Sequence, residues 1–164
     1  MKGTAPMLMI FIVTVCAISL CGCEDPYMAA IYQKRAETRR DLEQREAQDL
    51  AANRQKYANC IESQIPSDLM AAGRTSPLSV QEISVLADTA IQRCSRELYM
   101  LEHDASVLAY DRAVLSVPLG GHANYDLLAA DASQIGQEER EDWIRWGKTF
   151  FMETCLNRIN QIRQ

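Results

Sequence analysis

The chain has 164 residues and a formal net charge of −5, with 17 lysines and arginines against 22 aspartates and glutamates. This length suits one domain, and the acidic balance argues against nucleic acid as a partner, because a phosphate backbone needs a basic surface. Only 7 glycines and 5 prolines occur, strict alternation of apolar and polar residues is absent, and helix-forming residues dominate. The sequence therefore predicts an all-α fold.

Residues 1–22 have the pattern of a cleaved signal peptide. Lys2 and the amino terminus place positive charge ahead of an apolar run over residues 8–20, about 13 residues long. That run is shorter than the roughly 20 residues that a helix needs to span a bilayer. Glu24 and Asp25 follow it, and acids at that position favour export of the downstream chain. We therefore expect the leader to be removed and the remainder to be exported.

The end of this leader reads Leu20, Cys21, Gly22 and Cys23. These residues resemble the lipobox of bacterial lipoproteins, in which leucine, a small residue and glycine or alanine precede a cysteine. The resemblance covers the leader alone and implies that Cys23 is diacylated on its sulfur and becomes the first residue after cleavage. Two or three acyl chains hold a protein stably on a bilayer. The implied location is the bacterial cell envelope, lipid-anchored and facing the periplasm; an ordinary signal peptide or an uncleaved anchor is the alternative.

The segment 27–65 contains no glycine or proline, and Pro66 ends it, which predicts one helix of about 38 residues. Its first half is almost entirely polar, which is typical of a solvated helix supported by charge pairs four residues apart. We expect residues 23–45 to form a lipid-tethered linker or helical stalk and residues 46–164 to form a helical bundle. A partly disordered tether from 24 to about 40 is the alternative. The second half of the helix carries an apolar stripe at Tyr57, Cys60, Ile61 and Ile65.

A second helix is predicted over residues 79–117, after a connection that contains glycine and proline. Ser79 and Glu82 match a capping box, and Leu78 and Ile83 stand where a hydrophobic staple places its two residues. Apolar residues then recur at steps of three and four, which predicts a strongly amphipathic helix at the centre of the fold. They are Ile83, Ala87, Ala90, Cys94, Leu98, Leu101, Ala105, Leu108 and Leu115.

A long connection is predicted over residues 119–136, with room for a short helix at 125–132 that Asn124 could cap. The last predicted helix covers residues 137–162, and its acidic first turns and basic last turn complement the helix dipole. Its apolar stripe is Ile144, Phe151, Cys155, Ile159 and Ile162. The three predicted helices form a long hairpin with a third helix packed on it as a small bundle.

Of the six cysteines, Cys16 and Cys21 leave with the leader and Cys23 is acylated if the lipobox is used. Three remain, each on the apolar stripe of a different predicted helix: Cys60, Cys94 and Cys155. In an oxidising periplasm one pair is expected to form a disulfide. Cys60–Cys94 is favoured because it joins neighbouring helices. The two residues lie at unequal distances from their helix ends, so this pairing requires the connection 66–73 to take up the offset. Cys94–Cys155 is the rival pair, and three buried thiols are the remaining alternative.

No convergent catalytic or metal site is expected from the pattern. Glu102, His103 and Asp104 are consecutive, and consecutive helical residues point about 100° apart. The two histidines lack the paired spacing of zinc ligands. We therefore expect no catalytic residue, no metal and no cofactor.

The surface candidate lies on the last predicted helix, where Trp143, Trp146 and Phe150 fall on one side. These side chains either complete the core or meet a partner or the membrane interface. We expect a membrane-anchored, non-enzymatic envelope lipoprotein that binds another envelope protein as an accessory module. The alternative is a small envelope hydrolase or peptidoglycan-active enzyme. A convergent acid or Cys/His pair in a concave pocket would favour that alternative.

Overall fold

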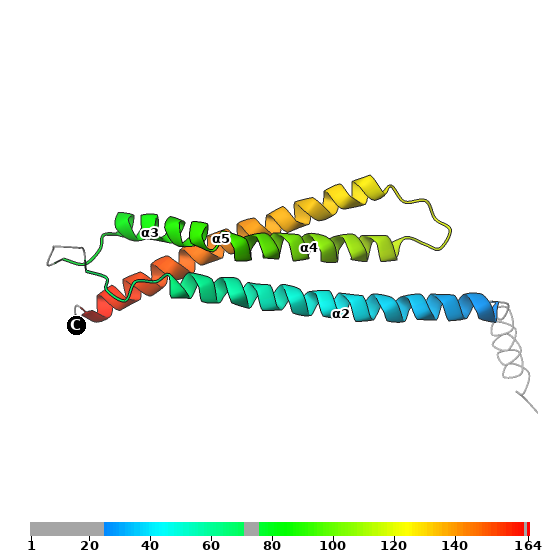
Figure 1. The fold of residues 1–164 in the computed structure, drawn as a ribbon, viewed down its shortest axis with the longest axis horizontal. Helices are drawn as coiled ribbons and strands as arrows, with labels where there is room; N and C mark the ends of the chain where they lie inside the picture. Colours follow the sequence, from blue (N-terminus) through cyan, green and yellow to red (C-terminus); the bar gives the residue numbers. More distant parts are fainter. Residues whose placement is uncertain (1–24, 71–75, 163) are drawn as a thin grey trace, which may run out of the picture. The chain divides into compact units, whose positions relative to one another are not determined.

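The computed structural model describes residues 25–70, 76–162 and 164, and these residues form four α-helices and no strand (Figure 1). The predicted all-α fold class is confirmed. The helices are α2 (Pro26–Ser63), α3 (Val80–Arg93), α4 (Ser95–Ser116) and α5 (Tyr125–Ile162). The predicted signal peptide and the lipobox with Cys23 lie outside the described residues.

The chain divides between Arg40 and Asp41 into two compact units. The described part of the first unit is the beginning of α2. Asp25 caps this helix, because its side chain accepts a hydrogen bond from the Tyr27 amide at 3.0 Å, and Pro26 occupies the first helical position, where its missing N–H has no cost. Residues 26–45, for which the sequence leaves stalk or tether open, are α-helical throughout.

The second unit is a helical bundle. It contains the part of α2 from Asp41 onward, α5, and α3 followed by α4; α3 and α4 together are called the arm. Figure 1 shows that α3 and α4 follow one another and run opposite to α5, which crosses them. The core is a single cluster to which every helix contributes. Its largest fully buried side chains are those of Tyr57, Phe151, Ile61, Leu69, Ile83, Leu98, Leu101, Cys94 and Cys155.

The arm differs from the prediction of one helix over 79–117, because it consists of two helices that meet at Cys94. The predicted capping box is present at its start: the Ser79 hydroxyl accepts from the Glu82 amide at 3.3 Å, and a Glu82 carboxylate oxygen accepts from the Ser79 amide at 2.8 Å. The predicted apolar face passes through the break without rotating. Each of its members from Ile83 to Leu108 is buried, and Leu115 is half-buried.

The predicted connection over 119–136 is wrong, because α5 is one helix from Tyr125 onward and the connection is limited to residues 117–124. Asn124 caps the whole helix, its side-chain oxygen accepting from the Leu127 amide at 3.2 Å. Gly136 lies inside α5, where α5 meets α4. A Cβ at that position would lie 2.5 Å from the Glu102 carbonyl oxygen and closer still to the Ser106 hydroxyl. Glycine is needed here for the close approach of two helices.

Cys60 and Cys94 are joined by a disulfide with 6.0 Å between their Cα atoms, and Cys155 is a buried free thiol. The two cysteines lie at unequal distances from their helix ends. Since α3 has 14 residues, it begins about 21 Å from Cys94, whereas α2 ends three residues after Cys60. The predicted connection 66–73 lies partly outside the described residues, and the residues described on either side of 71–75 are bonded to each other, with the Leu78 amide donating to the Leu69 carbonyl at 2.9 Å.

Candidate functional site

The three aromatic residues singled out on α5 lie in contact and form one aromatic surface, made of Trp143, Trp146 and Phe150. The ring centroids of Trp143 and Trp146 are 4.9 Å apart, and Trp146 stacks on Phe150 at 5.0 Å with 9° between the ring planes. Trp143 and Phe150 pack against the core, whereas Trp146 is 37% exposed. Trp143 and Phe150 therefore complete the core, as one of the two interpretations expects, and Trp146 is the most accessible member of the set.

Polar contacts between α2 and α5 fix the orientation of this surface. The indole N–H of Trp143 donates to a Glu139 carboxylate oxygen at 2.7 Å. The guanidinium of Arg54 donates to the same oxygen at 2.9 Å. Trp143 is half-buried and its N–H has a partner, as a buried indole requires. Glu139 therefore links the indole of Trp143 to Arg54 of α2 and restrains its orientation.

Tyr57 of α2 contacts the aromatic surface from the core side. It is fully buried, its ring meets Trp143 edge-on at 6.0 Å between centroids, and it lies 6.4 Å from Trp146. Burial raises the pKa of its hydroxyl to about 12, and this hydroxyl has no hydrogen-bond partner within the described residues. Gly147 makes room for it, because a Cβ there would lie 2.7 Å from the hydroxyl oxygen.

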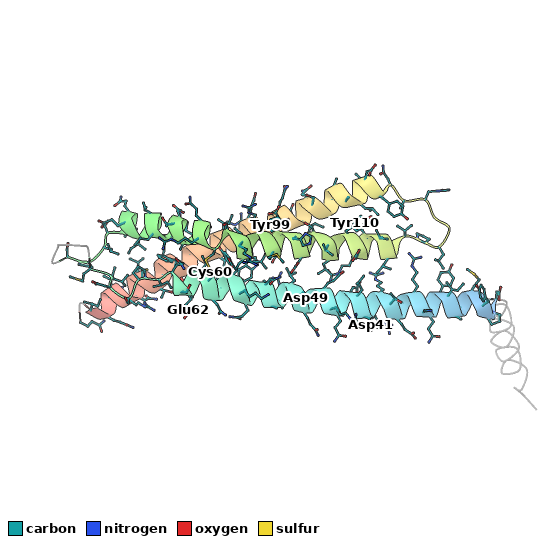
Figure 2. The ribbon with its side chains drawn as sticks, viewed as in Figure 1. Asp41, Asp49, Cys60, Glu62, Tyr99 and Tyr110 are labelled. Carbon is teal, nitrogen blue, oxygen red and sulfur yellow. A yellow bond between two sulfur atoms is a disulfide. The ribbon has the colours of Figure 1, made fainter. Side chains whose placement is uncertain are left out.

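A second candidate, the acid cleft, lies between α2 and α4 and has a volume of about 120 Å³. Figure 2 labels Asp49 on α2 and Tyr110 on α4, the two helices that form it. Its lining residues are Glu46, Asp49, His103, Asp104 and Val107. His103 and Asp104 are consecutive residues that the sequence analysis set aside, and the structure brings both to one cleft because α2 supplies the opposite wall.

Two pairs of side chains face each other across α2 and α4 beside this cleft. The Asn53 amide donates to the Asp104 carboxylate, and Glu46 lies close enough to Asp111 for their carboxyl groups to interact. The pKa of Glu46 is raised to about 7, first by burial and then by the hydrogen bond and the charge of Asp111. Arg112 acts in the opposite sense, and Asp49 raises the pKa further.

The spacing of α2 contained the signal that sequence reasoning missed. The buried stripe of this helix runs through Leu50, Asn53, Tyr57 and Ile61, and Glu46 continues it at the preceding step of four. An acid and an amide thus occupy positions that face the bundle. An apolar stripe defined by residue type alone excludes Glu46 and Asn53. For this reason the sequence predicts a solvated helix in the polar first half of α2.

No group of three or more histidine, cysteine, aspartate and glutamate side chains with the geometry of a metal site occurs in residues 25–70, 76–162 and 164. Across the same described ranges, none of the helices is both long enough and apolar enough to cross a membrane. Comparison with protein-family models, with curated proteins and with solved structures found no match to the chain.

Proposed function

We propose that the protein is a lipid-anchored lipoprotein of the bacterial cell envelope whose helical bundle binds another envelope protein without catalysing a reaction. The observation that carries the proposal is the residue order Leu20 to Cys23 directly after a short apolar run. The disulfide between Cys60 and Cys94 supports export, because such bonds persist in oxidising compartments and are rare in the cytosol.

Replacing Cys23 by alanine is expected to abolish acylation and release the protein from the membrane fraction, because the thioether sulfur that carries the acyl chains is lost. Cys21→Ala is the matched control: it removes a neighbouring cysteine but keeps a small residue ahead of Gly22. Mass spectrometry of the mature amino terminus and membrane fractionation provide the measurements. An unmodified wild-type terminus at a residue other than Cys23 would contradict the anchor.

The aromatic surface is the part of the bundle that best fits a protein partner. Aromatic residues are enriched at protein interfaces and supply large contact area at low entropic cost. Trp146 presents an exposed edge while stacked on Phe150, so little side-chain freedom remains to be lost on binding. The neighbouring Arg145 is exposed and ion-paired within α5 to Asp142, which gives the surface a polar rim.

Trp146→Ala should therefore reduce the yield of a crosslinked complex in the native host by about tenfold or more, since central aromatic residues of interfaces commonly contribute 2 kcal/mol or more. Ile162→Ala is the matched control, because Ile162 is an exposed apolar residue of the same helix, 61% accessible. Circular dichroism of both variants checks that the fold is retained. Equal loss of crosslinking in the two variants would exclude a specific role for the aromatic surface.

The acid cleft is the observation that favours the alternative, a small envelope hydrolase. Its volume of about 120 Å³ is small beside the roughly 300–1,000 Å³ of typical ligand sites. Digestion of peptidoglycan by the wild type, lost in Glu46→Gln, would nevertheless favour the enzyme over the binding protein.

A further inference from the structure

The contact between α2 and α4 is built in layers that alternate in polarity. Asn53 bonds to Asp104, and Glu46 and Asp111 each stand seven residues away from these along their helices. Because α2 and α4 run in opposite directions (Figure 1), this spacing sets Glu46 opposite Asp111. Leu50 and Leu108 lie between these pairs, 7% and 6% exposed. An apolar layer is therefore enclosed by two polar ones, and separating the helices here exposes little apolar surface compared with the core around Tyr57.

A hydrogen bond within the outer pair, Glu46 and Asp111, would require a proton. A carboxylate has no hydrogen to donate, so a hydrogen bond between two carboxyl groups exists only when one of them is protonated. Oε2 of Glu46 is buried and accepts from no N–H or hydroxyl donor within the described residues. Without the shared proton, two negative charges would face each other across the helix contact with a buried oxygen left unsatisfied.

The charges around this pair come from three helices. Asp49 of α2 adds a third negative charge, and Arg112 of α4 opposes it. His103 and Asp104 of α4 line the adjoining acid cleft. From α5, Glu139 lines the neighbouring cleft together with Arg112, and Arg54 is bound to it. Among the described residues, Arg112 is the one cation that acts on Glu46, so it compensates for a single carboxylate of the pair.

Near Cys60, the other end of the contact between α2 and α4 is fixed by a covalent bond. The disulfide from Cys60 joins α2 to the junction of α3 and α4, and Tyr57 and Ile61 are fully buried. Any separation of α2 from α4 within the bundle unit is therefore confined to the residues ahead of Tyr57, with the disulfide-linked end as the fixed point.

We propose that Glu46 and Asp111 form a proton-operated clasp: one proton shared by the two carboxyls holds residues 41–53 of α2 against α4, and loss of that proton lets this stretch separate. The clasp is a conformational device of the bundle and does not depend on the identity of a partner. Opening it uncovers Leu50 and Leu108, so the apolar layer becomes accessible only in the deprotonated form.

The expected pH range follows from the direction of the titration. The pKa of Glu46 lies at about 7 in the closed form against 4.5 for the free group. A raised carboxyl pKa means that the closed form binds the proton more tightly, so the added stability is present at acidic pH and is lost as the pH rises through about 7. These two values give a closing equilibrium about tenfold less favourable at pH 8 than at pH 6.

Hydrogen exchange with mass spectrometry on the full-length protein tests the clasp. Protection factors of peptides within 41–53, corrected for the intrinsic pH dependence of exchange, should fall about tenfold from pH 6 to pH 8. Peptides within 57–63 are the internal reference and should not change. Glu46→Gln should remove the response and remain protected at pH 8, because an amide donates to the Asp111 carboxylate without a titrating proton.

Asp49→Asn is the matched control, since it neutralises a neighbouring carboxyl of α2 outside the pair and should keep a pH response. Asp111→Asn gives an independent variant from the other helix and should behave as Glu46→Gln does, which keeps the test valid if one of the two fails to fold. Equal protection of wild-type 41–53 at both pH values overturns the proposal. A pH response that survives in Glu46→Gln or Asp111→Asn overturns it as well.

Discussion

Replacing Cys60 and Cys94 together by alanine should lower the free energy of unfolding by about 3–4 kcal/mol, the effect expected for a loop of 34 residues. The disulfide acts chiefly on the unfolded chain, whose conformational freedom it restricts. It also closes the contact between α2 and the junction of α3 and α4. Urea unfolding followed by circular dichroism measures the change, and the oxidised wild type should lose a similar amount when a reductant is added.

Cys155→Ala provides the control for this prediction, because Cys155 is buried and carries a free thiol. Its replacement removes a small apolar group and should cost about 1 kcal/mol. Because this variant keeps the disulfide, it should still lose about as much stability as the wild type when a reductant is added. Burial raises the pKa of this thiol, with Arg158 acting in the opposite sense, so little thiolate is present to exchange with the disulfide while the protein is folded. A wild type that is equally stable with and without reductant would contradict the structural role of the bond.

The disulfide and the clasp have complementary places in the bundle. Without the bond at Cys60, release of residues 41–53 would no longer be limited by a fixed end, and α2 would be held mainly by the burial of Tyr57 and Ile61. We infer that a reducing environment converts a local, proton-dependent separation into a wider one. Both features act on the part of α2 that belongs to the bundle unit.

Much of this fold was predictable because short-range sequence signals determine where the arm begins and which face it buries. Ser79 and Glu82 mark a helix start, and the apolar steps from Ile83 to Leu108 identify one face. Both signals lie within a few residues and need no knowledge of a neighbour. The face survives the break at Cys94, since the step of four from Cys94 to Leu98 keeps the helical period.

Two features were missed because their meaning lies in another helix. The sequence pattern places Gly136 at the end of a connection, because glycine has a low helix propensity when its tertiary contacts are unknown. The acid cleft escaped notice because its walls come from Glu46 and Asp104, which are far apart in the chain. In both cases the residue type contradicts the local pattern, and tertiary contact supplies the explanation.

Gly136→Ala should destabilise the bundle by about 2–3 kcal/mol, although alanine is the better helix former by about 1 kcal/mol. The new methyl group would meet the Glu102 carbonyl oxygen at 2.5 Å, and a backbone atom cannot rotate away. α4 and α5 would have to move apart where they pack most closely. Thermal unfolding by circular dichroism measures the loss. Ser106→Ala should restore little of it, because removal of the hydroxyl leaves that carbonyl in place.

Gly147→Ala is the matched comparison on the same helix, since its Cβ would meet a side-chain atom instead, the Tyr57 hydroxyl at 2.7 Å. We expect a loss of about 1–2 kcal/mol, and Tyr57→Phe in the same chain should return stability to near the wild-type value. That second substitution removes the obstructing atom, and it also removes a buried hydroxyl without a hydrogen-bond partner within the described residues. Rescue at Gly147 but not at Gly136 would separate a side-chain contact from a backbone one. Equal rescue at both sites would mean that α4 and α5 can part without cost, against the close packing inferred from Gly136.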